Sequence, residues 1–321
     1  MLCLFPLLPR EASSMAPGVD RLLWFTIAIS VFFTVLIFIL LFVFAIKYRR
    51  RSDDEVPHQI HGNLPFEITW TAIPALIMVI LFVWGTKVFV RYERPPIQAD
   101  HIYVVAKQWM WKIQHPEGPR EIDALHVPVG VPVELIMTSQ DVIHDFAVPA
   151  FRLKRDVLPD RYTTQWFTPT EVGDYRFYCD QYCGTFHSHM RGIVHVMTKG
   201  AYEKWLSGNM SHTESMAAAG AKLYESYGCI TCHGTGKAPP YVGLYGSTVR
   251  LEGGGTVVAN DAYIRQSILQ PSSQIVLGYK PIMPTFQGQI SETQILDIIA
   301  YIKSLATTPN AQGAEPAKEA K

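Results

Sequence analysis

A long apolar segment near the N-terminus is the strongest constraint on the fold. From Leu22 to Ile46 the only polar side chains are Thr26, Ser30 and Thr34, and none of them is charged. About 20 consecutive apolar residues are enough for a helix to cross the hydrocarbon core of a bilayer. The segment therefore predicts a membrane-spanning helix, with any globular domain outside the bilayer.

A second apolar segment runs from about Thr71 to Val90 and is interrupted only by Lys87, whose ammonium group can reach the interface. Taken alone, this segment is also compatible with a buried core helix. Lys47 and the run Arg49–Arg51 follow the first segment, so the positive-inside rule places the connecting loop in the cytoplasm. We therefore expect a multi-pass membrane protein, with everything after Val90 on the periplasmic face or in an equivalent outer space.

The second helix is expected to begin before its apolar run. Asn63 is a capping residue type and Pro65 suits a first helical turn. Glu67 would then lie in that turn at the cytoplasmic surface. Its simplest role is that of a carboxylate stabilised by the helix dipole.

The cysteines indicate metal or cofactor chemistry. The 321 residues allow two or three domains, and 28 basic against 28 acidic residues give no charge bias toward nucleic acid. Four of the five cysteines form two close pairs, each followed by a histidine, whereas a disulfide framework would spread them more widely. The fifth, Cys3, lies in the apolar stretch Leu2–Pro9, which lacks the basic start of a secretory signal.

Residues from about 95 to 200 have an all-β pattern. Short runs rich in Val, Tyr, Phe and Thr recur between glycines and prolines, which predicts a sandwich or barrel. The clearest runs are His101–Val105, Val133–Met137, Tyr162–Phe167, Tyr175–Tyr178 and Ile193–Met197.

A cluster of soft ligands lies between the last two of these runs: Cys179, Cys183, His187 and Met190. Thiolate, imidazole and thioether are copper ligands, and two thiolates that bridge two coppers would account for both cysteines. A second histidine must come from elsewhere, and His144 is the best placed. A zinc site or a disulfide is the alternative, but methionine is a poor zinc ligand.

The second cysteine pair forms Cys229-Ile-Thr-Cys232-His233, after a helical run that begins near Ala217. In a haem attachment motif two thiols form thioethers with the haem vinyls and the histidine binds iron. A redox dithiol or half a zinc site is the alternative. Beyond His233 there is no other histidine and one methionine, Met283, which makes Met283 the expected sixth ligand. A closing helix is predicted over Glu292–Leu305.

These motifs resemble two known families. The Cys-x-x-x-Cys-Gly-x-x-His-x-x-Met spacing, Asp141–Pro149 and Lys107–Trp111 resemble subunit II of the haem–copper cytochrome c oxidases, over roughly residues 20 to 200. The region after the linker resembles a class I cytochrome c domain. The whole arrangement resembles subunit II of a bacterial caa-type oxidase, in which a cytochrome c domain is fused to the C-terminus.

The resemblance implies a dinuclear copper A centre with two bridging thiolates, two imidazoles, a weak thioether ligand and one backbone carbonyl. By this resemblance Cys179 and Cys183 would supply the bridging thiolates, and His144 and His187 the two imidazoles. Met190 would be the weak thioether ligand, and Gln181 would offer its backbone carbonyl. Many family members have a glutamate at the position of Gln181, and its side chain also helps to hold magnesium. Glutamine lacks that carboxylate, so magnesium ligation by this chain is doubtful.

Two further roles follow from the resemblance. Trp109 aligns with the tryptophan through which electrons reach copper A, and Glu67 aligns with a glutamate at the mouth of a proton pathway into subunit I. By pattern alone, Trp109 and Trp111 would share one face of a strand and belong to the core. His189 and His195 are expected to be structural or exposed residues.

The implied function is that of the electron-transfer subunit of a respiratory terminal oxidase. A donor would reduce the haem c, and electrons would pass through copper A to subunit I for reduction of oxygen to water coupled to proton pumping. The expected partners are subunits I and III, cytochrome c or another periplasmic donor, and membrane lipid, with no nucleic acid. The alternatives are a subunit of a membrane nitric oxide reductase and a membrane-anchored electron carrier without a catalytic partner.

The predicted organisation has three folded parts: a two-helix transmembrane hairpin, an all-β cupredoxin-like sandwich and an all-α cytochrome c domain. The boundaries are 1–20 for a leader or extracytoplasmic segment, 21–92 for the hairpin, 93–200 for the copper A domain, 201–214 for a linker, 215–306 for the cytochrome c domain and 307–321 for a disordered tail.

Overall fold

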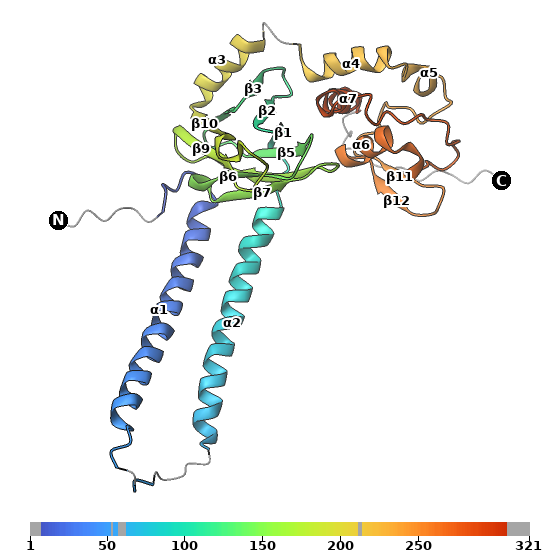
Figure 1. The fold of residues 1–321 in the computed structure, drawn as a ribbon. Coiled ribbons are helices and arrows are strands. Elements are labelled where there is room, and N and C mark those ends of the chain that lie inside the picture. The colour runs from blue at the N-terminus through green and yellow to red at the C-terminus, as the bar shows by residue number, and fades with distance from the viewer. Residues whose placement is uncertain (1–7, 53, 57–61, 211–213, 307–321) are drawn as a thin grey trace, which may run out of the picture.

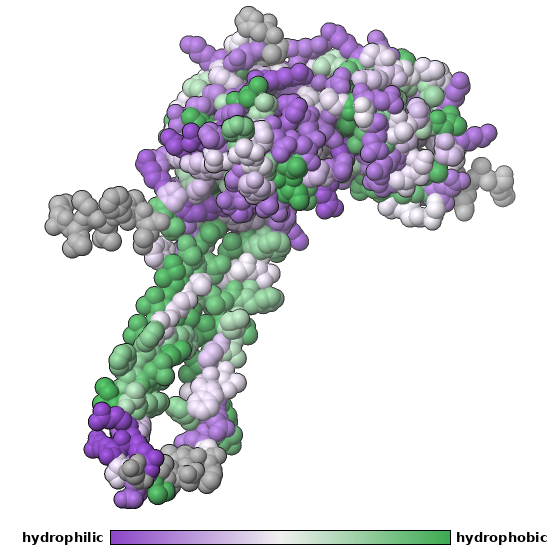
Figure 2. Space-filling model, in the orientation of Figure 1, coloured by the Kyte–Doolittle hydropathy of each residue, from purple (hydrophilic) through white to green (hydrophobic). Residues whose placement is uncertain are grey.

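The computed structural model describes residues 8–52, 54–56, 62–210 and 214–306. Two long helices, α1 (Ala16–Lys47) and α2 (Leu64–Glu93), lie side by side as a stalk below the rest of the molecule (Figure 1). Their surface is hydrophobic along most of its length (Figure 2), and both are long and apolar enough to cross a membrane. The predicted hairpin is confirmed. The expected disordered tail and Cys3 lie outside the described residues.

The cap of α2 follows the expected pattern. The Asn63 side chain accepts a hydrogen bond from the Phe66 amide, and Pro65 occupies the first turn. The Glu67 carboxylate accepts a 3.2 Å bond from the Asn63 amide in return. These two bonds satisfy amides that a helix start otherwise leaves without partners.

Above the stalk, ten strands form two packed sheets. The first sheet has the order β3-β2-β1-β5-β8 and the second β4-β10-β9-β6-β7. The bounds are β1 Asp100–Lys107, β2 Met110–Gln114, β3 Arg120–Ile122, β4 Ala124–Pro128, β5 Val133–Ser139, β6 His144–Val148, β7 Leu153–Val157, β8 Thr163–Phe167, β9 Gly173–Cys179 and β10 Arg191–Met197. β1 pairs with β5, and β4 with β10, in parallel; the other pairs are antiparallel.

The core between the sheets is strongly aromatic. Trp111, Phe146 and Phe177 pack edge-on or stacked at centroid distances of 4.7–6.1 Å. Phe151 and Phe167 are fully buried in the same core, with ring centroids 5.0 Å apart. Each predicted β run coincides with or overlaps an observed strand, which confirms the cupredoxin-like sandwich.

The C-terminal part is helical. It contains α3 (Lys199–Met210), α4 (Met216–Ser226), α5 (Ile230–His233), α6 (Asp261–Leu269), the short 3-10 turn η3 (Pro271–Ser273), α7 (Glu292–Ser304) and a small ribbon of β11 (Thr248–Arg250) and β12 (Thr256–Val258). α4 and α7 cross so closely that a Cβ on Gly220 would lie 2.0 Å from the Asp297 carbonyl oxygen. The closing helix predicted over Glu292–Leu305 is observed as α7.

This helical part packs directly on the outer face of the first sheet (Figure 1). Tyr103, Val105 and Ile136 of the sheet form one buried cluster with Met216 and Leu296. Polar contacts flank the cluster: Gln114 donates to Asp297 at 2.8 Å, Arg120 pairs with Asp297 at 3.1 Å, and Lys303 donates to the Tyr103 hydroxyl at 2.6 Å. The connecting helix α3 is also held, because its Trp205 stacks on His126 of β4.

Candidate copper and haem sites

The copper loop leaves β9 at Cys179 and rejoins the sheet at β10. The Cys179 amide donates to the Met190 carbonyl at 2.9 Å, which closes the loop at its base. The loop contains a 3-10 turn, η2 (His187–His189), and β6 begins at His144 beside β9. Neighbouring strand ends therefore bring together residues that are far apart in the sequence.

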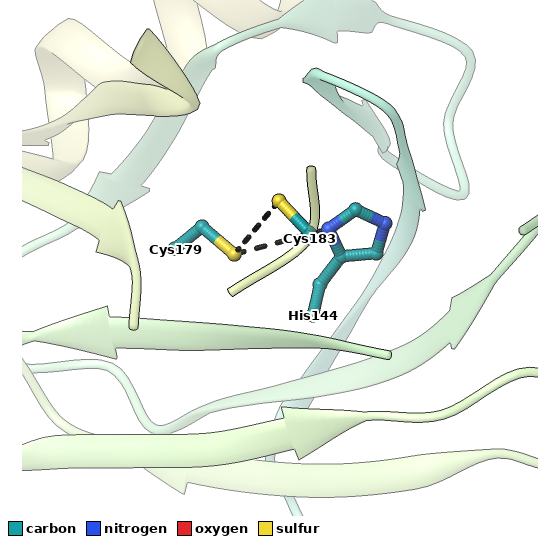
Figure 3. A group of neighbouring side chains, drawn as sticks. All are labelled: His144, Cys179 and Cys183. Atoms are coloured by element: carbon teal, nitrogen blue, oxygen red, sulfur yellow. Dashed lines mark hydrogen bonds between the residues drawn. The ribbon is translucent and has the colours of Figure 1, made fainter. Parts of the chain in front are cut away.

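The five predicted side-chain ligands lie close together, and Figure 3 shows three of them, His144, Cys179 and Cys183. The sulfurs of Cys179 and Cys183 lie 3.7 Å apart. His144 Nδ1 lies 3.8 Å from the Cys179 sulfur. His187 Nδ1 and Met190 Sδ lie 3.6 and 3.8 Å from the Cys183 sulfur. Two ligands of one tetrahedral metal are about 3.3–3.8 Å apart when each bond is about 2.0–2.3 Å long, so these spacings fit shared metal ions.

The site is buried and its cysteines are reduced. His144, Cys179, Cys183 and Met190 are at most 6% exposed, and the sulfur separation is far beyond the roughly 2.05 Å of a disulfide. Gln181 directs its backbone carbonyl to within 3.2 Å of the Cys179 sulfur, while its side chain is exposed. His189 lies on the exposed side of the loop, outside this cluster.

Without metal, the two thiols ionise differently. Burial opposes ionisation of Cys179, but hydrogen bonds with His144 and with backbone groups outweigh it and lower its pKa to about 6. Burial, together with the neighbouring charge of Cys179, raises the pKa of Cys183 to about 12. The pKa of His144 is raised, because its bonds to Cys179 and Asp141 outweigh burial. Cys179 therefore ionises more readily than an ordinary cysteine, and its thiolate is the form that binds a soft metal ion.

Asp141 is a further candidate functional residue, for which the sequence predicted no role. Its carboxylate lies 2.8 Å from His144 Nε2, so that Nδ1 is the nitrogen that faces the sulfurs. It also accepts bonds of 2.7 Å from the Gln108 and Val142 amides. A carboxylate behind a histidine ligand fixes the tautomer and the ring orientation. The available signal was an acidic residue three positions before the histidine.

Trp109 and Trp111 do not share a strand face as predicted, because Trp109 lies in the turn between β1 and β2, where the alternation of strand residues does not apply. The Trp109 indole donates to the Cys183 carbonyl at 3.2 Å and packs edge-on against Phe186. Gly184 permits this approach, since its φ is +114° and a Cβ there would lie 3.2 Å from the indole. Trp111 is buried with its ring 6.0 Å from that of His144.

Glu67 lies far from this cluster, in the first turn of α2 at the opposite end of the stalk (Figure 1). Its described contact is the helix-capping bond to Asn63. This capping bond stabilises the start of α2, which is sufficient to explain why position 67 carries a carboxylate.

The haem attachment residues line one apolar pocket of the helical part. Cys229, Cys232, His233 and Met283 all face this pocket, together with Tyr241 and Phe286. His233 Nδ1 lies 2.7 Å from the Pro239 carbonyl, which leaves Nε2 as the nitrogen available to iron. Burial lowers the pKa of His233, so the imidazole is neutral at physiological pH. Apolar walls with convergent polar ligands suit a large planar cofactor.

Comparison with protein families finds a match in each of the three parts of the chain. The profile described as "Cytochrome C oxidase subunit II, periplasmic domain" matches residues 119–197. The profile "Cytochrome C oxidase subunit II, transmembrane domain" matches residues 5–88, and "Cytochrome c" matches residues 217–306. In the order given, the three matches fall on the sandwich from β3 onward, on the stalk and on the helical part.

Two similar relatives carry the name cytochrome c oxidase subunit 2. The protein from Alkalihalophilus pseudofirmus is 32% identical over 288 residues, which cover 85% of this chain and 82% of the relative. The protein from Thermostichus vulcanus is 32% identical over 263 residues, which cover 64% and 79%. A crystal structure of the periplasmic domain of subunit II of cytochrome oxidase from Bradyrhizobium japonicum is 25% identical, with a TM-score of 0.36 over 38% of this chain and 100% of that one.

Proposed function

Because the chain belongs to the cytochrome c oxidase subunit II family and carries a C-terminal cytochrome c domain, we propose that it conducts electrons from a donor outside the membrane to subunit I. The chain is an oxidase subunit anchored in the membrane, with its soluble domains on the periplasmic side. In subunit I, oxygen would be reduced to water with coupled proton pumping. When bound, a dinuclear copper and a covalent haem supply reversible one-electron chemistry.

The observation that carries the copper proposal is the shared pair of sulfurs. Cys179 lies next to His144 and Cys183 next to His187 and Met190, while the sulfurs lie 3.7 Å apart. A single zinc ion would not use the methionine. We therefore assign two coppers to these side chains and to the Gln181 carbonyl. We assign no magnesium to Gln181, whose side chain offers only a neutral amide oxygen.

For the haem, we assign Cys229 and Cys232 as the residues that would form the thioether bonds, and His233 and Met283 as the residues that would bind its iron. The Pro239 carbonyl would hold the His233 ring in its plane by the 2.7 Å contact. The pocket is lined mainly by apolar side chains and the four haem-binding residues are half-buried in it. His/Met ligation gives the high potential that suits an electron carrier.

We further propose that electrons reach copper beside Trp109, since its indole contacts the Cys183 carbonyl and packs on Phe186. Glu67 is proposed as the start of a proton path into subunit I, because its exposed position on the cytoplasmic end of α2 would face that subunit. Cytochrome c or another periplasmic donor, subunit I and subunit III are the proposed partners.

The test is purification of the complex in mild detergent, followed by metal analysis and by optical and EPR spectra. We expect two coppers and one haem per chain, a mixed-valence copper signal, and haem that acidified acetone does not extract. Oxygen uptake with reduced cytochrome c should accompany subunit I. His187→Ala should abolish the copper signal, and His189→Ala, in the same loop, should leave it unchanged.

A single copper, or haem extracted by acidified acetone, would contradict the site assignment. A chain that purifies without subunit I and shows no oxygen uptake would instead be a membrane-anchored carrier. Nitric oxide consumption in place of oxygen uptake would identify the nitric oxide reductase alternative.

A further inference from the structure

Arg152 joins the copper domain to both membrane helices. Its guanidinium donates to both carboxylate oxygens of Asp20 in α1, from Nε at 2.7 Å and from Nη2 at 2.6 Å. Its backbone carbonyl accepts a 2.8 Å bond from the hydroxyl of Tyr92 in α2. The side chains of Arg152 and Asp20 are 9% and 7% exposed, so this contact is largely shielded from solvent.

The guanidinium makes four hydrogen bonds, through Nε, Nη1 and Nη2. Beyond Asp20, Nη1 donates to the Pro149 carbonyl at 2.7 Å and Nη2 to the Pro9 carbonyl at 2.8 Å. A planar fork with several fixed donors is specific to arginine, and a lysine ammonium cannot reproduce it. The contact therefore fixes direction as well as distance between α1 and the copper domain.

The backbone at Arg152 supports a dedicated role for this side chain. Its φ is +55°, at the end of the 3-10 turn η1 (Pro149–Phe151). A left-handed conformation is unfavourable for a residue with a Cβ, and glycine would avoid that cost. Glycine would also remove the guanidinium. Strained residues of this kind persist where the surrounding contacts require the side chain.

A fully buried strand connects this anchor to the copper ligands. Arg152 lies in the turn between β6 and β7, and His144 is the first residue of β6. The two strands pair along their whole length, from His144 with Val157 to Val148 with Leu153. At about 3.3 Å per residue, β6 spans about 13 Å from His144 to Val148. Because β6 is buried and paired along its whole length, a rotation at the turn would move His144 together with the rest of the copper domain.

We infer that Arg152 is a positioning residue that fixes the orientation of the copper domain relative to the membrane hairpin. This inference rests on the proposed function, since the orientation matters because subunit I would hold the hairpin and receive the electron. Of the other described side chains, Trp166 donates to the Arg91 carbonyl at 3.0 Å and Arg155 pairs with Glu93. Both of these bonds reach α2, whereas the Arg152 guanidinium holds α1.

The test compares Arg152→Lys with Arg176→Lys in the purified oxidase complex. Arg176 is an exposed residue of β9 in the same domain and serves as the matched control. In Arg152→Lys we expect an unchanged copper EPR spectrum, an unchanged rate of haem reduction by the donor, and electron transfer to subunit I slower by on the order of tenfold or more. Hydrogen exchange should accelerate at the start of α1 and in the β6–β7 turn. The control should match the wild type in all four measurements.

Asp20→Asn and Tyr92→Phe remove one partner each and should slow the same step, Tyr92→Phe by less because it loses one neutral hydrogen bond. They also provide the comparison if Arg152→Lys prevents assembly. Wild-type transfer rates, or unchanged hydrogen exchange, in these variants would overturn the positioning role. A wild-type complex without a dinuclear copper signal would overturn the proposed function itself.

Discussion

Gly220→Ala is expected to destabilise the haem domain, although alanine is the better helix former. Gly220 lies in α4 where it crosses α7, and a Cβ there would meet the Asp297 carbonyl oxygen at 2.0 Å and its carbon at 2.6 Å. Ordinary contact begins near 3.4 Å, so the two backbones must separate by about 1.4 Å (3.4 − 2.0). The atoms in the way belong to a helix backbone and cannot rotate aside.

The magnitude follows from two opposing effects. Replacing glycine by alanine inside a helix stabilises it by up to about 1 kcal/mol. Overpacking costs about 1–3 kcal/mol, and a clash between two backbones belongs at the upper end of that range. The net loss is therefore about 2 kcal/mol, which corresponds to roughly 8–16 °C in Tm for a domain of this size.

The assay is thermal unfolding of the full chain in mild detergent, with hydrogen exchange of the α7 amides to assign the transition. The matched control is Gly208→Ala in α3, where an added Cβ would have no atom within 4 Å. The control should be neutral or more stable than the wild type, by up to about 1 kcal/mol. A Gly220→Ala variant as stable as this control would refute the argument from helix contact.

Three further outcomes are expected at the metal sites. Met283→Ala should convert the haem to a high-spin or weak-ligand optical spectrum, and an unchanged low-spin spectrum would exclude Met283 as the ligand. Asp141→Asn should weaken copper binding by about 10–100-fold in a chelator competition, because the carboxylate orients His144; Asp174→Asn, at an exposed acid of the same domain, should leave the affinity unchanged. In the copper-free chain, the pKa of Cys179 is lowered to about 6, so thiolate absorbance should appear as the pH rises through that value. Absorbance that begins only near pH 9 would contradict the contact between Cys179 and His144.

The clustering of the proposed copper ligands could be predicted from the sequence because most of them follow short local spacings. Cys179, Cys183, His187 and Met190 lie within one loop, and the loop geometry follows from its two flanking strands. His144 could also be predicted as a ligand, because the second imidazole had to come from another part of the chain. The Asp141 contact needed the structure, since a carboxylate three residues from a histidine has many possible partners.

The position of the haem domain could not be predicted in this way. β1 is buried on both faces, and its pattern of aromatic and aliphatic residues predicts a strand without identifying what covers Tyr103. The contacts from Asp297 to Gln114 and Arg120 join segments more than 170 residues apart. Such contacts depend on how two folded domains dock. Hydrophobic periodicity and secondary-structure propensity describe single elements, so they do not predict this docking.

The covered outer face of the first sheet has a consequence for how such a chain can change over evolution. Once Tyr103, Val105 and Ile136 have become part of a buried cluster with Met216 and Leu296, the fused domain is no longer a removable addition. A gene truncated after α3 would encode a copper domain with an adhesive apolar patch, prone to self-association. Loss of the fusion would therefore require polar replacements on β1 and β5 first, whereas the copper ligands on the other sheet could remain unchanged.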